Sequence, residues 1–206
     1  MGLLTEGKAL TPEQMKDASK YIRDHGVTQF LNTWSRVKDV ANDELKFGDE
    51  IECAILALDS ENKTVRMSVR SAELRKLLTD KEEQFSHEME GGTWHPEFGG
   101  WMIESTPSRP YNKFASDLLR VERNMIVRRR RLLSVLAPDE IAPYVTCFPL
   151  LGVGDFIKNP QPFHAPYSKS NFIPDYVINP HPRFAALATN IRTRRGCKVD
   201  IQVPLF

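Results

Sequence analysis

Acidic residues in two strand-like segments are the feature of this sequence that most constrains its fold. Glu50 and Glu52 follow Gly48-Asp49 and open an apolar run, and Glu97 and Glu104 flank a second short run. Side chains two positions apart on a strand point to one face, so Glu50 and Glu52 should project together, about 7 Å apart along the chain. Carboxylates held this close repel each other unless a cation or a shared proton compensates. The sequence therefore favours strands with one acidic face.

The chemistry of this acidic face is that of a hard-cation site. Ligand sets made only of oxygen suit Mg²⁺ or Mn²⁺, and these ions often share substrate phosphates. The predicted metal ligands are Glu50, Glu52, Glu97 and Glu104. The alternative for Glu50 and Glu52 is a solvated strand face that binds nothing, and the second acidic segment favours the metal site over it.

The composition is typical of one soluble globular domain. The chain has 206 residues, 41% of them hydrophobic and 27% charged, with a net charge of +1. This balance gives no overall field that would attract nucleic acid or an acidic membrane surface, and the apolar runs are far too short to span a bilayer. The three cysteines, Cys53, Cys147 and Cys197, lie far apart without a disulfide or zinc pattern. We therefore expect a reducing, cytoplasmic location.

Two helices are expected before the first acidic strand. Thr11-Pro12-Glu13-Gln14 supplies a hydroxyl N-cap, a proline at the first helical position and a capping-box glutamine. Gly26 is expected to end this helix. Apolar residues then recur at helical spacing over residues 27–37, which predicts a second amphipathic helix whose apolar face packs in the core.

The remainder of the pattern mixes strands and helices. Residues 50–59 are predicted to form a strand, which turns at 59–63 and returns over 65–69 as an antiparallel hairpin. The other expected elements are a helix over 71–78, a polar loop over 80–92, a strand over 101–104, a strand over 144–148, a short helix near 175–178, a helix from about 184 to 195, and a strand over 198–206. The α+β class follows from this mixture.

A long helix is expected over residues 113–136, and a run of four arginines interrupts it. Its predicted buried stripe comprises Leu118, Val121, Met125, Leu132 and Leu136. Each helical step turns ~100°, so the four arginines cannot all face solvent, and Arg128 and Arg129 should lie on or beside the stripe. Either a carboxylate or a phosphate near the glutamate cluster binds them, or both side chains extend past the core to water.

The C-terminal part carries weaker signals. Residues 168–175 are polar with apolar anchors, which fits either a substrate-facing loop or a surface crossing. Arg192, Arg194 and Arg195 are expected to interact with the helix macrodipole before Gly196, with anion binding as the second interpretation. The chain stops within the last strand pattern, which predicts a truncated domain.

Several motifs together resemble the family of eukaryotic glutamate–cysteine ligase catalytic subunits. The matching segments, in the expected order, are Met1-Gly2-Leu3-Leu4, 48–52, 95–99, 102–107, 121–125 with the arginine run, 147–149, 168–174, 181–184 and 190–196. The resemblance covers essentially the whole chain. This sequence departs from the family pattern at Cys53, Arg123, Asn171 and Tyr176, and none of these positions belongs to the four glutamates.

The resemblance implies a function and a fold. The family joins the γ-carboxyl of L-glutamate to the amine of L-cysteine with ATP, through a γ-glutamyl phosphate, in the first step of glutathione synthesis. It implies a glutamine-synthetase-like, curved, mainly antiparallel sheet with flanking helices, incomplete in this chain. Residues 1–206 would form the N-terminal part of a single catalytic domain. Mg²⁺ would be bound by Glu50, Glu52, Glu97 and Glu104, and a regulatory modifier subunit would be a partner.

Two other functions remain open at this stage. One is a non-catalytic interaction or regulatory fragment that keeps the fold, which metal affinity would distinguish from a ligase. The other is a nucleic-acid module built on residues 128–131 and 192–195. The balanced charge and the lack of aromatic residues between those arginines argue against nucleic acid.

Overall fold

The computed structural model describes residues 7–8, 10–145, 147–197 and 201–204, and confirms the α+β class. In chain order the elements are α1 (Pro12–Val37), β1 (Lys46–Phe47), β2 (Ile51–Ala54), β3 (Leu56–Asp59), β4 (Thr64–Met67), α2 (Ser71–Gln84), β5 (Gly92–Pro96), β6 (Met102–Pro107), β7 (Tyr111–Asn112), α3 (Ala115–Leu133), β8 (Glu140–Ile141), a 3-10 turn (Asp175–Val177) and α4 (Pro182–Arg195). None of these helices is long and apolar enough to cross a membrane within the described residues.

The strands form three small antiparallel sheets. Their orders are β2-β6-β5, β4-β3-β8 and β1-β7. The strand predicted over 50–59 is interrupted at Ile55, whose backbone N–H donates to the Trp101 carbonyl at 2.7 Å and whose carbonyl accepts from Ser68 N–H at 2.9 Å. As a result β2 pairs with β6, while β3 pairs with β4 and β8. One continuous apolar run thus serves two sheets.

The predicted hairpin is confirmed in β3 and β4. Leu56 lies opposite Met67 and Asp59 lies opposite Thr64. The Asp59 carboxylate accepts from the backbone N–H of Asn62 at 3.0 Å and from its side-chain amide at 2.8 Å. This local hydrogen bonding closes the turn as Asp and Asn commonly do.

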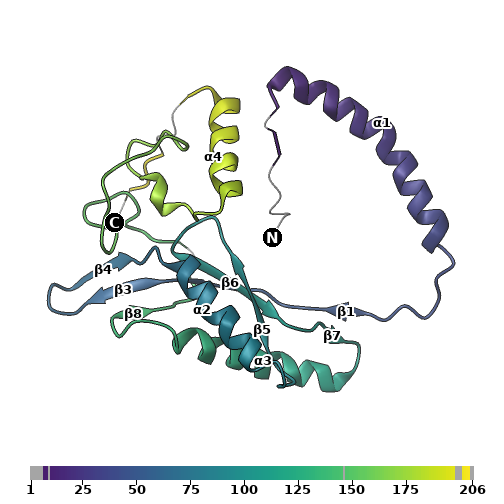
Figure 1. Ribbon diagram of the computed structural model, residues 1–206, viewed down its shortest axis with the longest axis horizontal. Helices are drawn as coiled ribbons and strands as arrows, with labels where there is room; N and C mark the ends of the chain where they lie inside the picture. The colour runs from purple at the N-terminus through teal and green to yellow at the C-terminus, as the bar shows by residue number, and fades with distance from the viewer. Residues whose placement is uncertain (1–6, 9, 146, 198–200, 205–206) are drawn as a thin grey trace.

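Helices α2 and α3 cover one face of the β2-β6-β5 sheet (Figure 1). Strand residues Cys53, Trp94 and Ile103 pack there against Leu74 of α2 and Leu132 of α3. A second apolar cluster lies under the C-terminal loops and includes Met67, Trp101, Phe148, Phe156 and Val177. Since α2 and α3 occupy one face only, the opposite face of β2-β6-β5 carries the alternate side chains.

Helix α1 corrects two expectations. Its capping box is confirmed, with Gln14 N–H donating to the Thr11 hydroxyl at 3.2 Å and Gln14 Oε1 accepting from Thr11 N–H at 3.0 Å. Gly26 does not end the helix, because a glycine inside a helix costs only about 1 kcal/mol and α1 continues to Val37. The predicted core packing of 27–37 is also wrong, since Phe30 is 65% exposed and Trp34 is 54% exposed.

Helix α3 buries a different face from the predicted stripe. Leu118 is 63% exposed. The buried residues of α3 are Asp117, Asn124, Arg128, Arg131 and Leu132. Leu132 was expected there, and Arg128 was expected on or beside the stripe. Asn124 and Arg131 were not expected, because their polar partners lie on other segments and leave no periodic apolar signal.

Further differences concern the loops. Helix α2 continues six residues beyond the expected end at residue 78, and β5 occupies the end of the expected loop over 80–92. The strand expected over 144–148 is absent from the described residues of that range, and the short strand β8 lies just before it. Residues 201–204 are also in no strand. The rest of the strand expected over 198–206 lies outside the described residues. Gly196 ends α4 in the left-handed conformation at φ 68°, as predicted.

Candidate metal centre

The register of the β2-β6-β5 sheet brings acidic side chains from two strands together. Glu52 of β2 lies directly opposite Glu104 of β6, and Glu104 lies opposite His95 of β5. Directly opposed residues point to the same face of a sheet. One carboxylate oxygen from each of Glu50, Glu52 and Glu104 lies within 4.8 Å of the others. The sequence-predicted pair Glu50 and Glu52 therefore meets a third carboxylate at a site that pairing creates.

Glu97 joins this cluster through Glu104. The two side chains share a hydrogen bond, and the Glu97 carboxylate also accepts from Phe98 N–H at 3.3 Å. Burial raises the pKa of Glu104 to about 7, helped by the hydrogen bond to Glu97 and by the negative charges of Glu50 and Glu97. Glu104 is only 2% exposed. Either a shared proton or a cation would relieve the repulsion between these carboxylates.

His95 is the residue of this face that sequence reasoning missed as a site candidate. Its Nε2 lies 3.0 Å from the Thr106 hydroxyl, and its ring is near Glu50. Burial lowers the pKa of His95, and the charge of Glu50 opposes that shift. The strand alternation of Trp94, His95 and Pro96 was a usable signal, but only the pairing of β5 with β6 reveals which acid His95 faces.

On the opposite face of the same sheet, the negative charge is paired with a cation of the protein. Asp49 pairs with the guanidinium of Arg128 and accepts from the Tyr111 hydroxyl at 2.9 Å. Arg128 is 0% exposed, and it also donates to the Ser105 carbonyl at 2.7 Å and to Asn124 Oδ1 at 2.8 Å. Burial and the hydrogen bond to Asp49 raise the pKa of Tyr111 to about 12. This guanidinium has protein partners at each of its nitrogens.

Arg128 and Arg129 both lie on the helix-covered side of the sheet. Arg129 donates to the Ala142 carbonyl, lies 4.9 Å from the centre of the Tyr144 ring, and approaches Cys53 Sγ at 4.0 Å. Burial raises the pKa of the Cys53 thiol, and the Arg129 charge opposes this. The anionic partner expected for a buried arginine is thus Asp49, a carboxylate adjacent in sequence to the glutamate cluster but on the other face.

The polar loop over 168–175 is bound to α4. Arg192 donates from Nε at 3.0 Å and from Nη2 at 2.7 Å to the Ser168 carbonyl. The Asp175 carboxylate accepts from the backbone N–H groups of Tyr167 at 2.6 Å and Ser168 at 3.1 Å. Arg192 therefore fastens this loop to α4, in addition to its position in the last helical turn.

The donor set at the acidic face fits a hard divalent cation. It offers carboxylate oxygens only, and Mg²⁺ accepts such ligands at about 2.0–2.1 Å with waters or substrate oxygens completing its shell. Three oxygens within 4.8 Å of one another are near the spacing that one ion needs. Burial is the main cause of the raised pKa of Glu104, and the negative charges of Glu50 and Glu97 add to it; such an ion would relieve that repulsion.

Comparison with known proteins places the chain in a family. The glutamate-cysteine ligase family model matches residues 2–206. The human glutamate–cysteine ligase catalytic subunit is 41% identical over 209 residues, which cover 100% of this chain and 33% of that protein. The mouse catalytic subunit is 40% identical, with the same coverage, and the Dictyostelium discoideum glutamate–cysteine ligase is 36% identical, with 32% of its length covered. The chain thus spans about a third of the length of these relatives, and it belongs to the glutamate–cysteine ligase family.

Proposed function

We propose that this chain carries part of the catalytic domain of an ATP-dependent glutamate–cysteine ligase. The reaction would join the γ-carboxyl of L-glutamate to the amine of L-cysteine through a γ-glutamyl phosphate, as the first step of glutathione synthesis in the cytoplasm. Family membership supports the reaction, and the clustered carboxylates of Glu50, Glu52 and Glu104 are the single observation that supports a role for this chain in it.

In this proposal the acidic face binds Mg²⁺ or Mn²⁺. Glu50, Glu52 and Glu104 would be direct ligands, and Glu97 would join them or orient Glu104 through their hydrogen bond. The ion would offset the negative charge of the transferred phosphoryl group, which is the main demand of such a reaction. Glu104 must release its proton to act as a ligand, so metal and proton compete for the same oxygen.

The helix-covered face would keep the ligands in register. Arg128 bonds to Asp49, the residue before Glu50, and to the Ser105 carbonyl, the residue after Glu104. One buried guanidinium therefore ties β2 to β6 beside the two ligand positions. Arg128 and Arg129 fill a structural role in this account, with their donors directed to protein groups and away from the acidic face.

Two broader elements of the proposal follow from the family. The β2-β6-β5 sheet would form part of a glutamine-synthetase-like curved sheet, and a regulatory modifier subunit would be a partner. The relatives named catalytic subunits support the second element. Since this chain spans a third of those relatives, the pockets for L-glutamate, L-cysteine and ATP would need further residues, and the isolated chain would not complete a reaction cycle.

The test is Mn²⁺ binding measured by calorimetry on this chain and on Glu50→Gln/Glu52→Gln. A matched control is Glu83→Gln/Glu122→Gln, which removes two exposed carboxylates elsewhere. We expect Mn²⁺ to bind the native chain and the control, and binding to be lost in Glu50→Gln/Glu52→Gln. Absence of binding to the folded native chain, or equal binding to all three, would favour the non-catalytic interaction fragment.

A further inference from the structure

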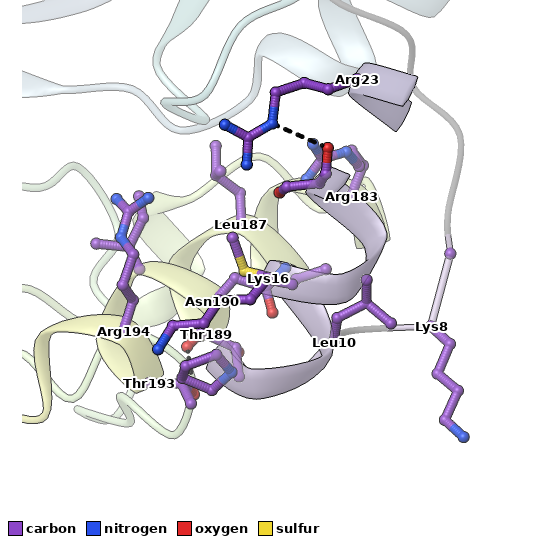
Figure 2. Close-up of a pocket in the computed structure, with 16 residues that line it drawn as sticks. Lys8, Leu10, Lys16, Arg23, Arg183, Leu187, Thr189, Asn190, Thr193 and Arg194 are labelled. Carbon is purple, nitrogen blue, oxygen red and sulfur yellow. Dashed lines mark hydrogen bonds between the residues drawn. The ribbon is translucent and has the colours of Figure 1, made fainter. Parts of the chain in front are cut away.

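A groove of about 850 Å³ lies between α1 and α4, and none of the four predicted metal ligands lines it (Figure 2). Its walls are the faces of two helices, and the lining residues of α1 recur at three-to-four-residue steps from Pro12 to Arg23. On α4 the corresponding positions run from Arg183 to Arg194. Each wall therefore extends for about 17 Å at 1.5 Å per residue. The groove is long and helix-lined, and its volume lies in the range of binding sites.

The charges around this groove have one sign. Its cationic lining residues are Lys8, Lys16, Arg23, Arg183 and Arg194. No carboxylate lines it among the described residues, although Glu13 and Asp17 lie elsewhere on α1. None of these five cations forms an ion pair with a described residue, and Arg23 donates only to the carbonyl of Ser19 in its own helix, at 3.2 Å. The other exposed basic residues on α1 include Lys20, which pairs with Asp24 at 2.6 Å.

The cations are spread along the groove. Figure 2 shows Arg23 and Arg183 toward one end and Arg194 toward the other, with Lys16 between them. Apolar side chains of Leu10, Met15, Leu187 and Ile191 also line the groove, together with small and uncharged polar residues, and Leu10 and Met15 are nearly half exposed. A ligand that fits must therefore present several negative charges at intervals together with apolar groups.

From this arrangement we infer that the α1–α4 groove is a docking site for an acidic amphipathic helix of another protein. An amphipathic helix places apolar residues at i, i+3, i+4 and i+7 against a helix-lined groove, which is an established mode of peptide recognition. Its flanking glutamates would pair with Lys16 and Arg23 on one wall and with Arg183 and Arg194 on the other. This inference is independent of the proposed ligase function.

The observations disfavour other occupants. A second copy of this chain docked groove to groove would set one group of unpaired cations against another, which costs free energy. A lipid surface is broad and cannot enter a concave groove between two helices. Nucleic acid would need stacking aromatic side chains or a strongly basic surface, and the groove has no aromatic lining residue among those described while the net charge is +1.

The experiment measures binding of a labelled peptide of about 16 residues by fluorescence anisotropy, with glutamates and leucines spaced as on an amphipathic helix. A second peptide with lysine in place of each glutamate is the charge control. We expect only the acidic peptide to bind, and its affinity to fall as salt rises, because exposed ion pairs are screened.

Matched variants locate the binding. Arg23→Glu/Arg194→Glu reverses two charges in the groove, and Arg36→Glu/Arg195→Glu makes the same change in net charge on the same two helices outside it. We expect at least a tenfold loss of affinity in the first and less than about a twofold change in the second. Circular dichroism confirms folding, and Mn²⁺ binding should be equal in both variants.

Three outcomes would overturn the inference. They are no binding of the acidic peptide to the native chain, equal losses in the two variants, and displacement of the peptide by ATP without added metal at concentrations too low to act through ionic strength. The last result would assign the groove to a phosphate compound. Because Mn²⁺ binding is measured in the same samples, failure of the groove proposal is distinguishable from failure of the metal centre.

Discussion

The two faces of the β2-β6-β5 sheet treat negative charge in opposite ways. On the helix-covered face, Asp49 is paired with Arg128 and bonded to Tyr111. On the other face, Glu50, Glu52 and Glu104 converge with no cation among the described residues in an ion pair with them. Alternate residues of one short segment thus have opposite environments. The comparison teaches that a carboxylate with a protein cation is part of the architecture, whereas a cluster without one is available for a ligand.

The physical basis of this difference is the supply of partners. Helix α3 brings Arg128 and Asn124 to one face, so burial of charge there is compensated by hydrogen bonds. Nothing comparable reaches the glutamates, and burial raises the pKa of Glu104 to about 7, helped by the hydrogen bond to Glu97 and by the negative charges of its neighbours. Each prediction below tests one side of this contrast.

The largest expected effect is on the helix-covered face. Arg128→Met removes the cation that compensates Asp49 and leaves three acceptors without their donor. We expect the free energy of unfolding to fall by about 3 kcal/mol, as for other broken buried pairs. Urea denaturation measures it, and Arg130→Met, an exposed neighbour on the same helix, should change stability by less than about 0.5 kcal/mol. Equal effects of the two substitutions would show that the buried contacts of Arg128 do not contribute specially to stability.

The matching change on the acidic face should have the opposite sign for stability. Glu104→Gln removes a carboxyl that is buried beside other negative charges, so at pH 8 we expect a gain of roughly 1 kcal/mol in the free energy of unfolding without metal. Mn²⁺ affinity should fall by at least about 100-fold, beyond what supporting residues usually cost. Asp49→Asn is the comparison, and it should destabilise. A Glu104→Gln chain that binds Mn²⁺ normally would remove Glu104 from the ligands.

The acidic face should also make both the stability and the Mn²⁺ affinity depend on pH. The pKa of Glu104 in the folded state, about 7, lies above the ordinary carboxyl value of 4.5. The stabilisation that comes from binding this proton more tightly in the folded state is therefore fully present below about pH 4.5. Stability without metal should therefore decline as the pH rises from about 4.5 to about 7. Because Mn²⁺ displaces that proton, its affinity should rise by up to about tenfold per pH unit over the same range and level off above pH 7. Calorimetry from pH 5.5 to 8 measures this, and a flat profile would exclude proton competition at Glu104.

Part of this contrast could be predicted from local sequence. The period of two along a strand correctly separates Asp49 from Glu50 and Glu52, and the capping residues Thr11 and Gln14 correctly begin α1. Both are local effects, determined by residues within one turn or one pleat. Gly26 shows the limit even of local signals, because its propensity was outweighed by the helix around it.

The rest depends on pairing between distant segments. The register that opposes Glu52 to Glu104 joins residues about fifty positions apart, and β5 begins within the loop that was expected over 80–92. Helix α3 is the clearest example, because its apolar periodicity placed Leu118 inside although that side chain is exposed and Asn124 is buried. Helical spacing did place Arg128 on or beside the buried stripe. The partners of Asn124 and Arg128, which are Glu90 and Asp49, come from other segments, so no pattern within the helix identifies them.

The smallest expected effect concerns His95, which shares the acidic face without joining its ligand set. Its Nε2 is engaged by the Thr106 hydroxyl at 3.0 Å, and the converging oxygens come from Glu50, Glu52 and Glu104. His95→Gln preserves a hydrogen-bonding group toward Thr106, so Mn²⁺ affinity should change by less than about twofold, below the roughly tenfold loss that begins to mark a supporting residue. The same calorimetric titration measures this, with Glu104→Gln as the positive control. A loss above tenfold would make the imidazole a ligand, which would favour softer ions such as Zn²⁺ over Mg²⁺ and change the chemistry assigned to this face.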